Sequence, residues 1–326
     1  MAEIVVFLGM GGTIVGTAPV AGDNVGYTAA QVGVAQLLES VPGLQRALGR
    51  YQAASEQVCQ IDSKDLGDAD WRALLQRTQH HLSRPEVVGV VVTHGTDTLE
   101  ETAYFLSRTL APELLAHKPV VLTCAMRPAS SLTPDGPGNM ADAAAVALCQ
   151  GACGVLVVCA GKVHGAAQVQ KVHPYRVDAF DSGEAGPLAV VEEGRVRLLS
   201  AWPALDCSVL RTDLAALPVW PRVELLLSHA SATGAVVRAL LNDADAETAL
   251  RGIVVAGTGN GTIHKDMEAA LLAAQQGGVR VLRVSRCAYG QVVGDSAAAR
   301  SGAFPHSDLS AVKARIALML DLAAQT

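Results

Sequence analysis

Aromatic residues, charged residues and long apolar runs are all scarce in this sequence. Aromatic side chains make up 4% of the 326 residues and charged ones 17%, although hydrophobic residues reach 50%. The apolar content is therefore mainly Ala, Val and Leu, which suits helices packed tightly on a buried parallel sheet. Because no apolar run reaches about 20 residues, the chain is not expected to cross a membrane. The formal net charge of −6 gives no basic surface, so a nucleic acid is not expected as a partner.

The cysteines lack the spacing of a disulfide framework. None of the seven stands in a CxxC pair, and several lie in apolar runs: Cys59, Cys124, Cys149, Cys153, Cys159, Cys207 and Cys287. An odd number of buried thiols fits a reducing compartment. The chain also reaches its first strand by residue 4, without a basic and apolar leader segment. The sequence therefore predicts a soluble, cytoplasmic protein.

Strand-like and helix-like segments alternate along the first part of the chain. Apolar, β-branched runs predict strands at 3–8, 56–61, 87–93, 119–124 and 154–159. Helical periodicity between them predicts helices at 30–39, 66–82, 98–115 and 139–150. Such alternation indicates βαβ units and a parallel sheet. The segment 188–199, with Glu193-Gly194 at its centre, predicts an antiparallel hairpin at one edge of that sheet.

Three prolines and a loss of periodicity separate the first part of the chain from a smaller second part. The predicted divisions are an N-terminal catalytic domain at 1–203, a linker at 204–221 and a C-terminal domain at 222–326. The last part again alternates strands, at 223–227, 252–256 and 279–284, with helices at 231–241, 265–276 and 308–323. The predicted fold class is α/β, with a larger parallel-sheet domain that includes an antiparallel hairpin and a smaller α/β domain.

Two of the strand-like runs end in a threonine that follows glycine. The run 4–8 leads into Gly11-Gly12-Thr13, and the run 87–92 leads into Gly95-Thr96-Asp97. Because polar groups at the carboxyl ends of parallel strands line the ligand crevice, both hydroxyls are expected there. The glycine spacing does not match the GxGxxG dinucleotide pattern, and no Walker lysine follows. The two threonines therefore indicate nucleophilic chemistry rather than phosphate binding.

A segment rich in Gly, Ala, Pro and Asn follows Thr13 and extends from Val15 to Gly26, with Tyr27 at its far end. This composition is typical of a mobile loop. A loop that closes over a site excludes water and can bring in a phenol. The segment is therefore interpreted as a closing loop that completes the site with Tyr27.

A threonine hydroxyl becomes a useful nucleophile only when a neighbouring base takes its proton. His94 is one candidate base, although a histidine packed beside a strand end is more often structural. Lys171 is the other, and its alternative is a solvated surface lysine. Thr98 and Glu101 have the spacing of a capping box at the start of a helix, and we predict that role for them.

The motifs resemble those of the bacterial-type L-asparaginases in order and in approximate spacing, over essentially the whole chain. They are Gly11-Gly12-Thr13-Ile14, Asp62-Ser63, the run Thr93 to Ala103, Ala125-Met126-Arg127-Pro128, Asp135-Gly136-Pro137 with Asn139, and Gly257-Thr258-Gly259-Asn260-Gly261. The resemblance implies conversion of L-asparagine to L-aspartate and ammonia through a threonine acyl-enzyme, with side activity on L-glutamine. It implies no metal and no organic cofactor.

The resemblance also assigns roles to individual residues. The catalytic set that it implies is Thr13 as nucleophile with Tyr27, Thr96, Asp97 and Lys171. The substrate-binding set is Asp62, Ser63, Thr96, Asp97, the backbone of Ala125, and Asn260 from a neighbouring subunit. This last assignment implies a homotetramer built from dimers.

The sequence departs from the family pattern at two informative places. Met10 stands where members commonly have a small residue or threonine, and we interpret it as packing beneath the turn that carries Thr13. Secreted members have a glutamate at a position that falls at or beside Ala297, and that acid is absent here. Three alternatives to an asparaginase remain. They are a weakly catalytic sensor or binding protein on the same fold, a glutaminase-like amidase, and the domain that releases ammonia for tRNA-dependent amidotransferases.

Overall fold

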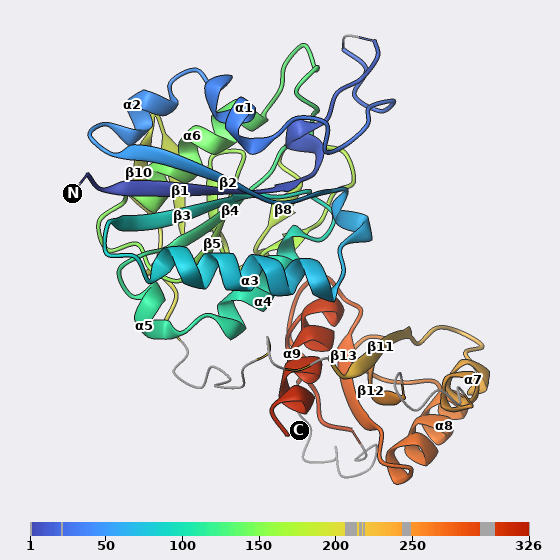
Figure 1. Ribbon diagram of the computed structural model, residues 1–326. Coiled ribbons are helices and arrows are strands. Elements are labelled where there is room, and N and C mark those ends of the chain that lie inside the picture. Colours follow the sequence, from blue (N-terminus) through green and yellow to red (C-terminus); the bar gives the residue numbers. More distant parts are fainter. Residues whose placement is uncertain are drawn as a thin grey trace. The chain divides into compact units, whose positions relative to one another are not determined.

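The structure is a computed structural model that describes residues 2–20, 22–205, 214, 217, 219–242, 249–293 and 304–325. The chain divides into two compact units, Met1–Val209 and Leu210–Thr326. Each unit has its own sheet and its own helices (Figure 1). Within the described residues, no helix has both the length and the apolar character needed to cross a bilayer. The α/β fold class predicted from the sequence is confirmed, with a large, mostly parallel sheet and a smaller second unit.

The first unit is built on an eight-stranded sheet with the order β10-β9-β6-β5-β4-β3-β1-β2. Five neighbouring strands are mutually parallel, in the order β2, β1, β3, β4 and β5. At the β5 edge the sheet continues through β6, β9 and β10, each of which is antiparallel to the strand before it. Their bounds are β1 Ile4–Gly11, β2 Gln52–Ile61, β3 Val87–Thr93, β4 Val120–Thr123, β5 Val155–Cys159, β6 Lys162–Gly165, β9 Ala189–Glu192 and β10 Arg195–Leu198. The carboxyl ends of the parallel strands therefore all lie at one edge of the sheet.

Helices cover both faces of this sheet, as Figure 1 shows. One face carries α1 Val34–Glu39, α2 Leu44–Leu48 and α6 Gly136–Ala147, and the other carries α3 Asp68–Leu82, α4 Leu99–Thr109 and α5 Pro112–Leu115. The continuous apolar runs of β1 and β3 are buried on both sides, as expected for central parallel strands. Close packing extends to the backbone, because a Cβ at Gly89 of β3 would lie 3.0 Å from the carbonyl oxygen of Ala147 in α6.

The structure corrects the sequence-based prediction at several places in this unit. The helix expected at 98–115 is interrupted after Thr109, because Leu110 and Ala111 are extended before Pro112, which begins α5. This agrees with the restriction that proline places on the preceding residue. The strand β6 was not anticipated as part of the sheet. It follows β5 through a two-residue turn, Ala160-Gly161, in which both residues have positive φ.

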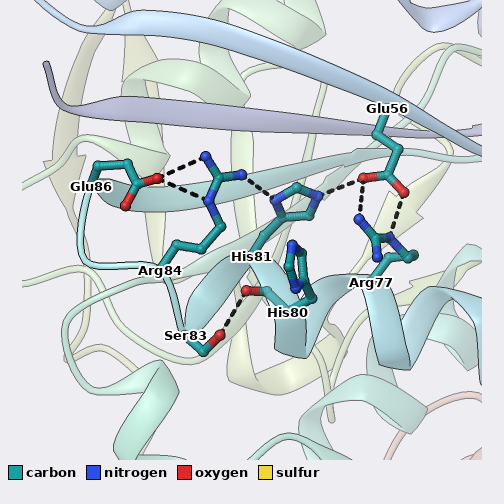
Figure 2. A network of polar contacts seen from close by, with 7 residues as sticks. All are labelled: Glu56, Arg77, His80, His81, Ser83, Arg84 and Glu86. Carbon is teal, nitrogen blue, oxygen red and sulfur yellow. Dashed lines mark hydrogen bonds and ion pairs between the residues drawn. The ribbon is translucent and has the colours of Figure 1, made fainter.

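A network of charged side chains joins β2 to α3 (Figure 2). The Glu56 carboxylate accepts hydrogen bonds from both the Arg77 guanidinium and His81 Nε2, and Arg77 lowers the pKa of Glu56. Arg84 contacts His81 Nδ1 at 3.1 Å. Since arginine can only donate, His81 Nδ1 accepts and its Nε2–H donates to Glu56. The network therefore anchors the strand that leads into Asp62.

The second unit has a three-stranded parallel sheet, β11-β12-β13, with bounds Arg222–Leu227, Leu250–Gly257 and Arg280–Ser285. Its helices are α7 Ala235–Leu241, α8 Lys265–Gln276 and α9 Ala311–Ala323. An apolar core joins the sheet to α7 and α8 through Ile253, Val255, Val237, Met267 and Leu271. On the other face α9 lies so close that a Cβ at Gly252 would be 2.9 Å from Leu318.

Candidate active site

Thr13 is positioned by a tight turn at the carboxyl end of β1. Gly11 and Gly12 both have positive φ, at 96° and 84°, and Thr13 opens the short 3-10 helix η1, Thr13–Val15. A Cβ at Gly12 would lie 2.4 Å from Gly95 Cα, so no larger residue fits there. Met10 is buried beneath this turn with its sulfur 3.5 Å from Cys59 Sγ, as we expected. The turns that carry Thr13 and Thr96 therefore meet backbone to backbone.

The segment 17–28, which we call the closing loop, brings Tyr27 to Thr13. Its ends are joined by a bridge between Thr17 and Thr28, and the Asp23 carboxylate accepts the amides of Val25 and Gly26. The Tyr27 hydroxyl lies 2.7 Å from Thr13 Oγ1. The structure thus places together the two residues that the sequence left fourteen positions apart.

The closing loop is held by a second loop, residues 128–133. The Ser130 hydroxyl accepts a hydrogen bond from the Ala18 amide at 2.9 Å, and the Ser130 carbonyl accepts one from the Gly22 amide at 3.2 Å. The amide of Ala129 donates to the Gly16 carbonyl at 3.0 Å. Ser130 did not stand out in the sequence, because a serine in a loop carries no signal of its long-range partner.

The second group of predicted catalytic residues also lies together. Lys171 Nζ donates to Thr96 Oγ1 at 2.8 Å and forms an ion pair with Asp97 Oδ1 at 2.6 Å. Lys171 comes from the short strand β7, Gln170–Lys171, which pairs with β8, Phe180–Asp181. The Lys171 side chain is 16% exposed, so it is not a solvated surface lysine. A lysine and a threonine in contact can transfer a proton within this group.

Ser63 connects the ends of β2 and β3. Its hydroxyl accepts from the Asp97 amide at 3.2 Å, and its carbonyl accepts from the Thr98 hydroxyl at 2.8 Å. The capping box predicted for Thr98 and Glu101 is therefore wrong. Thr98 occupies the N-cap position of α4, but its side chain makes no capping hydrogen bond, because its hydroxyl donates to the Ser63 carbonyl instead. Neighbouring Asp62 accepts from the Lys64 amide at 3.4 Å.

The loop after β4 places Ala125 beside the Thr13 turn. The Asp135 carboxylate accepts the amides of Met126 and Arg127, both at 2.9 Å, which fixes the path of the backbone. A Cβ at Gly136 would lie 2.8 Å from Ile14 Cγ1 and 3.4 Å from the Ala125 side chain. Glycine at this position therefore lets the loop and the turn approach each other.

His94 is buried away from both threonines of the site. It is completely buried, and burial lowers the pKa of its imidazole to about 4. Nδ1 lies 2.7 Å from the Gly95 carbonyl oxygen and Nε2 lies 2.9 Å from the Thr102 hydroxyl, so both ring nitrogens are occupied. Of the two candidate bases, only Lys171 touches a threonine of the site.

Asn260 belongs to the second unit. Its side-chain amide donates to the Val293 carbonyl at 2.9 Å and accepts from the Val293 amide at 2.7 Å, which closes a loop after β12. Ala297, at or beside the position where the sequence analysis noted a missing glutamate, lies outside the described residues. In the part of the chain that the structure describes, no three His, Cys, Asp or Glu side chains are grouped to hold a metal ion.

Comparison with known proteins identifies the family. Two family profiles match in order: Asparaginase, N-terminal, at residues 4–204, and Glutaminase/Asparaginase C-terminal domain, at residues 222–326. L-asparaginase 2 of Escherichia coli strain K12 is 33% identical over 322 residues, which cover 98% of this chain and 88% of that protein. Glutaminase-asparaginase of Pseudomonas fluorescens biotype A is 33% identical over 326 residues, covering 98% and 86%.

A solved structure agrees with the sequence relatives. The crystal structure of a probable cytoplasmic L-asparaginase from Campylobacter jejuni matches with a TM-score of 0.87 at 33% identity, over 99% of this chain and 95% of that one. The match therefore includes both units. Fold, sequence and the order of the two profiles agree, and the chain belongs to the asparaginase family.

Proposed function

We propose that the protein is an L-asparaginase, an amidohydrolase that converts L-asparagine to L-aspartate and ammonia, with side activity on L-glutamine. Membership of the family supports the reaction class, and the names of the Escherichia coli and Pseudomonas relatives support the two substrates. The observation that carries the proposal is that each threonine hydroxyl has its own proton partner. Thr13 contacts Tyr27, and Thr96 contacts Lys171.

In the proposed reaction Thr13 Oγ1 attacks the carbon of the side-chain amide, and its proton passes toward Tyr27. The tetrahedral intermediate collapses when the amide nitrogen takes the proton of the Tyr27 hydroxyl, which the proton of Thr13 replaces, and the nitrogen leaves as ammonia, so that an ester remains on Thr13. Water then hydrolyses the ester: its proton is accepted by the group of Thr96 and Lys171, with Lys171 uncharged in this step, and that group returns the proton to Thr13 Oγ1 as L-aspartate leaves. The closing loop excludes bulk water during the first half of this sequence.

Recognition of the amino acid needs a carboxylate for its ammonium group and neutral donors for its carboxylate. We assign Asp97 and Asp62 to the ammonium side, and Ser63 and backbone amides to the carboxylate side. The Ala125 backbone lies near the amide under attack, since its loop packs beside the Thr13 turn. These assignments account for a zwitterionic substrate with the residues present and without a metal or cofactor.

We further propose that Asn260 reaches the active site of a neighbouring subunit in a homotetramer built from dimers. What supports this is that Asn260 lies in an exposed loop whose shape is set by its two bonds to Val293. Subunit mixing tests it directly. A Thr13→Ala chain, inactive alone, and an Asn260→Ala chain, weakly active alone, gain activity in mixed oligomers if the site is shared, and show no gain if it is not.

We propose the cytoplasm as the compartment. The Campylobacter relative is named as a probable cytoplasmic L-asparaginase. The six cysteines within the described residues are all unpaired, which fits a reducing environment. Fractionation of the native host cells, with marker enzymes for each compartment, decides this point.

The test of the activity is ammonia release by the purified protein with L-asparagine and L-glutamine side by side, over a wide concentration range. We expect hydrolysis of asparagine that disappears in Thr13→Ala, while the oligomer and its thermal midpoint are retained. Release from glutamine at equal or higher kcat/KM would identify a glutaminase-like amidase. No release from either amide, with binding of an amino acid retained, would identify a sensor on the same fold.

A further inference from the structure

The hydrogen bonds around His94 determine which of its nitrogens carries the proton. A carbonyl oxygen can only accept, so the 2.7 Å contact with Gly95 requires a hydrogen on Nδ1. The buried ring is neutral, so Nε2 carries none and accepts from the Thr102 hydroxyl. The indole N–H of Trp71 can only donate, and it donates a hydrogen bond to the Thr102 hydroxyl oxygen at 2.9 Å. All three donors therefore point in one direction, from Trp71 through Thr102 and His94 to Gly95.

The position of Gly95 is fixed independently of His94. A Cβ at Gly12 would lie 2.4 Å from Gly95 Cα, and a Cβ at Gly95 would lie 2.5 Å from Ser63 Oγ. Gly95 is thus enclosed between the ends of β1 and β2. These contacts fix where the residue lies, whereas the bond from His94 fixes the direction in which its carbonyl points.

The direction of the Gly95 carbonyl fixes the direction of the next amide. The peptide bond between Gly95 and Thr96 is trans, and in a trans peptide the C=O and N–H point to opposite sides. The carbonyl points inward to the buried imidazole, so the Thr96 N–H points away from it. This amide donates to no acceptor among the residues that the structure describes. Its neighbour, the Thr96 hydroxyl, is held by Lys171.

We propose that His94 is a positioning residue for the hydrolysis, which turns the Thr96 N–H toward the reacting amide by holding the Gly95 carbonyl. The proposal rests on the asparaginase activity proposed above. As Thr13 attacks, the amide oxygen of the substrate gains negative charge, and a donor fixed in advance stabilises that charge without reorganising. His94 contributes by its N–H and not by titration. Lys171 sets the side chain of Thr96, and His94 sets its backbone.

Two neutral substitutions of His94 test whether the site needs an N–H that reaches the Gly95 carbonyl or only a polar side chain at this position. In His94→Asn the side-chain nitrogen is attached to Cγ, as Nδ1 is, and still reaches the Gly95 carbonyl. In His94→Gln the nitrogen is one bond farther out, as Nε2 is, and faces Thr102 instead. We expect His94→Asn to keep kcat within about tenfold of wild type and His94→Gln to lose about 100-fold, because losing one such donor costs 10²–10³ in rate. KM changes by less than about threefold in both.

The wild-type protein provides a measurement that does not depend on either variant folding. Long-range proton–nitrogen NMR spectra of protein labelled at histidine report which ring nitrogen bears the hydrogen. We expect a neutral His94 with the hydrogen on Nδ1 at pH 7. A hydrogen on Nε2, or an imidazolium, overturns the proposal. So do equal losses of kcat in the two variants, full activity in both, or an effect confined to KM.

The proposed activity and the proposed role of His94 are distinguished by separate measurements. If the wild-type protein releases no ammonia from asparagine or glutamine, the proposed function fails, and the NMR measurement still decides whether His94 holds the Gly95 carbonyl. If the enzyme is active but the donor position has no effect on kcat, only the role of His94 fails. Circular dichroism and thermal midpoints of both variants show whether a loss of rate reflects unfolding.

Discussion

The hydroxyl oxygens of Thr13 and Tyr27 lie 2.7 Å apart, although one is anchored in the sheet turn and the other in the closing loop. The loop therefore adopts a conformation in which the phenol touches the proposed nucleophile. The Gly16 carbonyl and the Thr17–Thr28 bridge give the loop a defined base on which Tyr27 is carried. A proton path that depends on one loop contact is open to a direct test.

Tyr27→Phe removes only the hydroxyl and keeps the ring. Because the proton of Thr13 then has no positioned acceptor, we expect kcat to fall by about 10²–10⁴-fold, the usual contribution of a general acid or base. KM and the thermal midpoint stay close to wild type. Steady-state kinetics with asparagine measure this. Tyr51→Phe is the matched control, since Tyr51 lies just before β2, at the opposite end of that strand from Ser63, and contacts Arg50. Equal kinetics in the two variants would remove Tyr27 from the mechanism.

Lys171→Met keeps the length of the side chain and removes its charge. The change deletes contacts with Thr96 Oγ1 and Asp97 Oδ1, and we expect kcat to fall by at least about 10³-fold. The Asp97 side chain is about half exposed and remains hydrated, so the loss of stability stays below about 1 kcal/mol. Single-turnover assays and thermal melting separate these effects.

Lys162→Met serves as the control for Lys171→Met, because it removes a lysine from β6 of the same unit without touching Thr96 or Asp97. We expect it to leave turnover within about twofold of wild type. A Lys171→Met enzyme that turns over as fast as this control would show that the contacts at Thr96 are structural only.

The hydrogen bond between the Ser130 hydroxyl and the Ala18 amide is expected to limit the opening of the closing loop. Ser130→Ala deletes the acceptor for the Ala18 amide and leaves the carbonyl that binds Gly22. One lost hydrogen bond of about 1 kcal/mol shifts the open and closed populations by about fivefold toward open. We expect faster proteolytic cleavage within residues 17–28 and a kcat/KM reduced by about threefold to tenfold.

Ser131→Ala is the matched control in the same loop. The Ser131 hydroxyl accepts a hydrogen bond from the amide of Thr133 and makes none to the described residues of the closing loop, 17–20 and 22–28. Cleavage within residues 17–28 therefore stays at the wild-type rate. If both serine variants are cleaved equally fast, the effect comes from loosening of residues 128–133 as a whole and not from the bond to Ala18.

Of two hairpin turns with the same backbone conformation in the large sheet, one could be predicted from the sequence and one was missed. The turn Glu193-Gly194 was predicted, since its second residue is a glycine that tolerates the positive φ of 73°. The turn Ala160-Gly161 has the same positive-φ pair and was missed. The strand that follows this turn is only four residues long, Lys162–Gly165, which is too short to show strand periodicity, and β6 was therefore left out of the predicted sheet.

Polar residues at strand ends show the same limit in the site. Thr13, Thr96 and Asp97 could be found because parallel topology brings strand ends together. The bond from Thr98 to Ser63 could not be found, because a threonine before a helix has a strong local alternative as a cap. The role of His94 depends on Trp71 and Thr102, and the pattern of residues around His94 does not indicate that these partners reach it.

Asp142 in α6 gives the protein a destabilising carboxylate near neutral pH. It is half-buried, and burial raises its pKa from 3.8 to about 6. Between these two values the folded protein binds more protons than the unfolded chain, so stability falls as the pH rises through this window. Above about pH 6 the folded state holds the charged carboxylate at a cost, and below about pH 4 the cost disappears.

Asp142→Asn removes this charge with almost no change in shape, and it should stabilise the protein at pH 7.5 by about 1–2 kcal/mol. Full conversion of the pKa change gives about 3 kcal/mol, and the smaller figure allows for partial hydration of the carboxylate. Urea denaturation of wild type and variant from pH 5 to 8 measures the difference, which grows up to about pH 6.5 and then levels off. The exposed Glu39→Gln variant controls for net charge. A difference that is constant over this range, or a wild type that is the more stable protein at pH 8, would show that the Asp142 carboxylate is compensated in the native state.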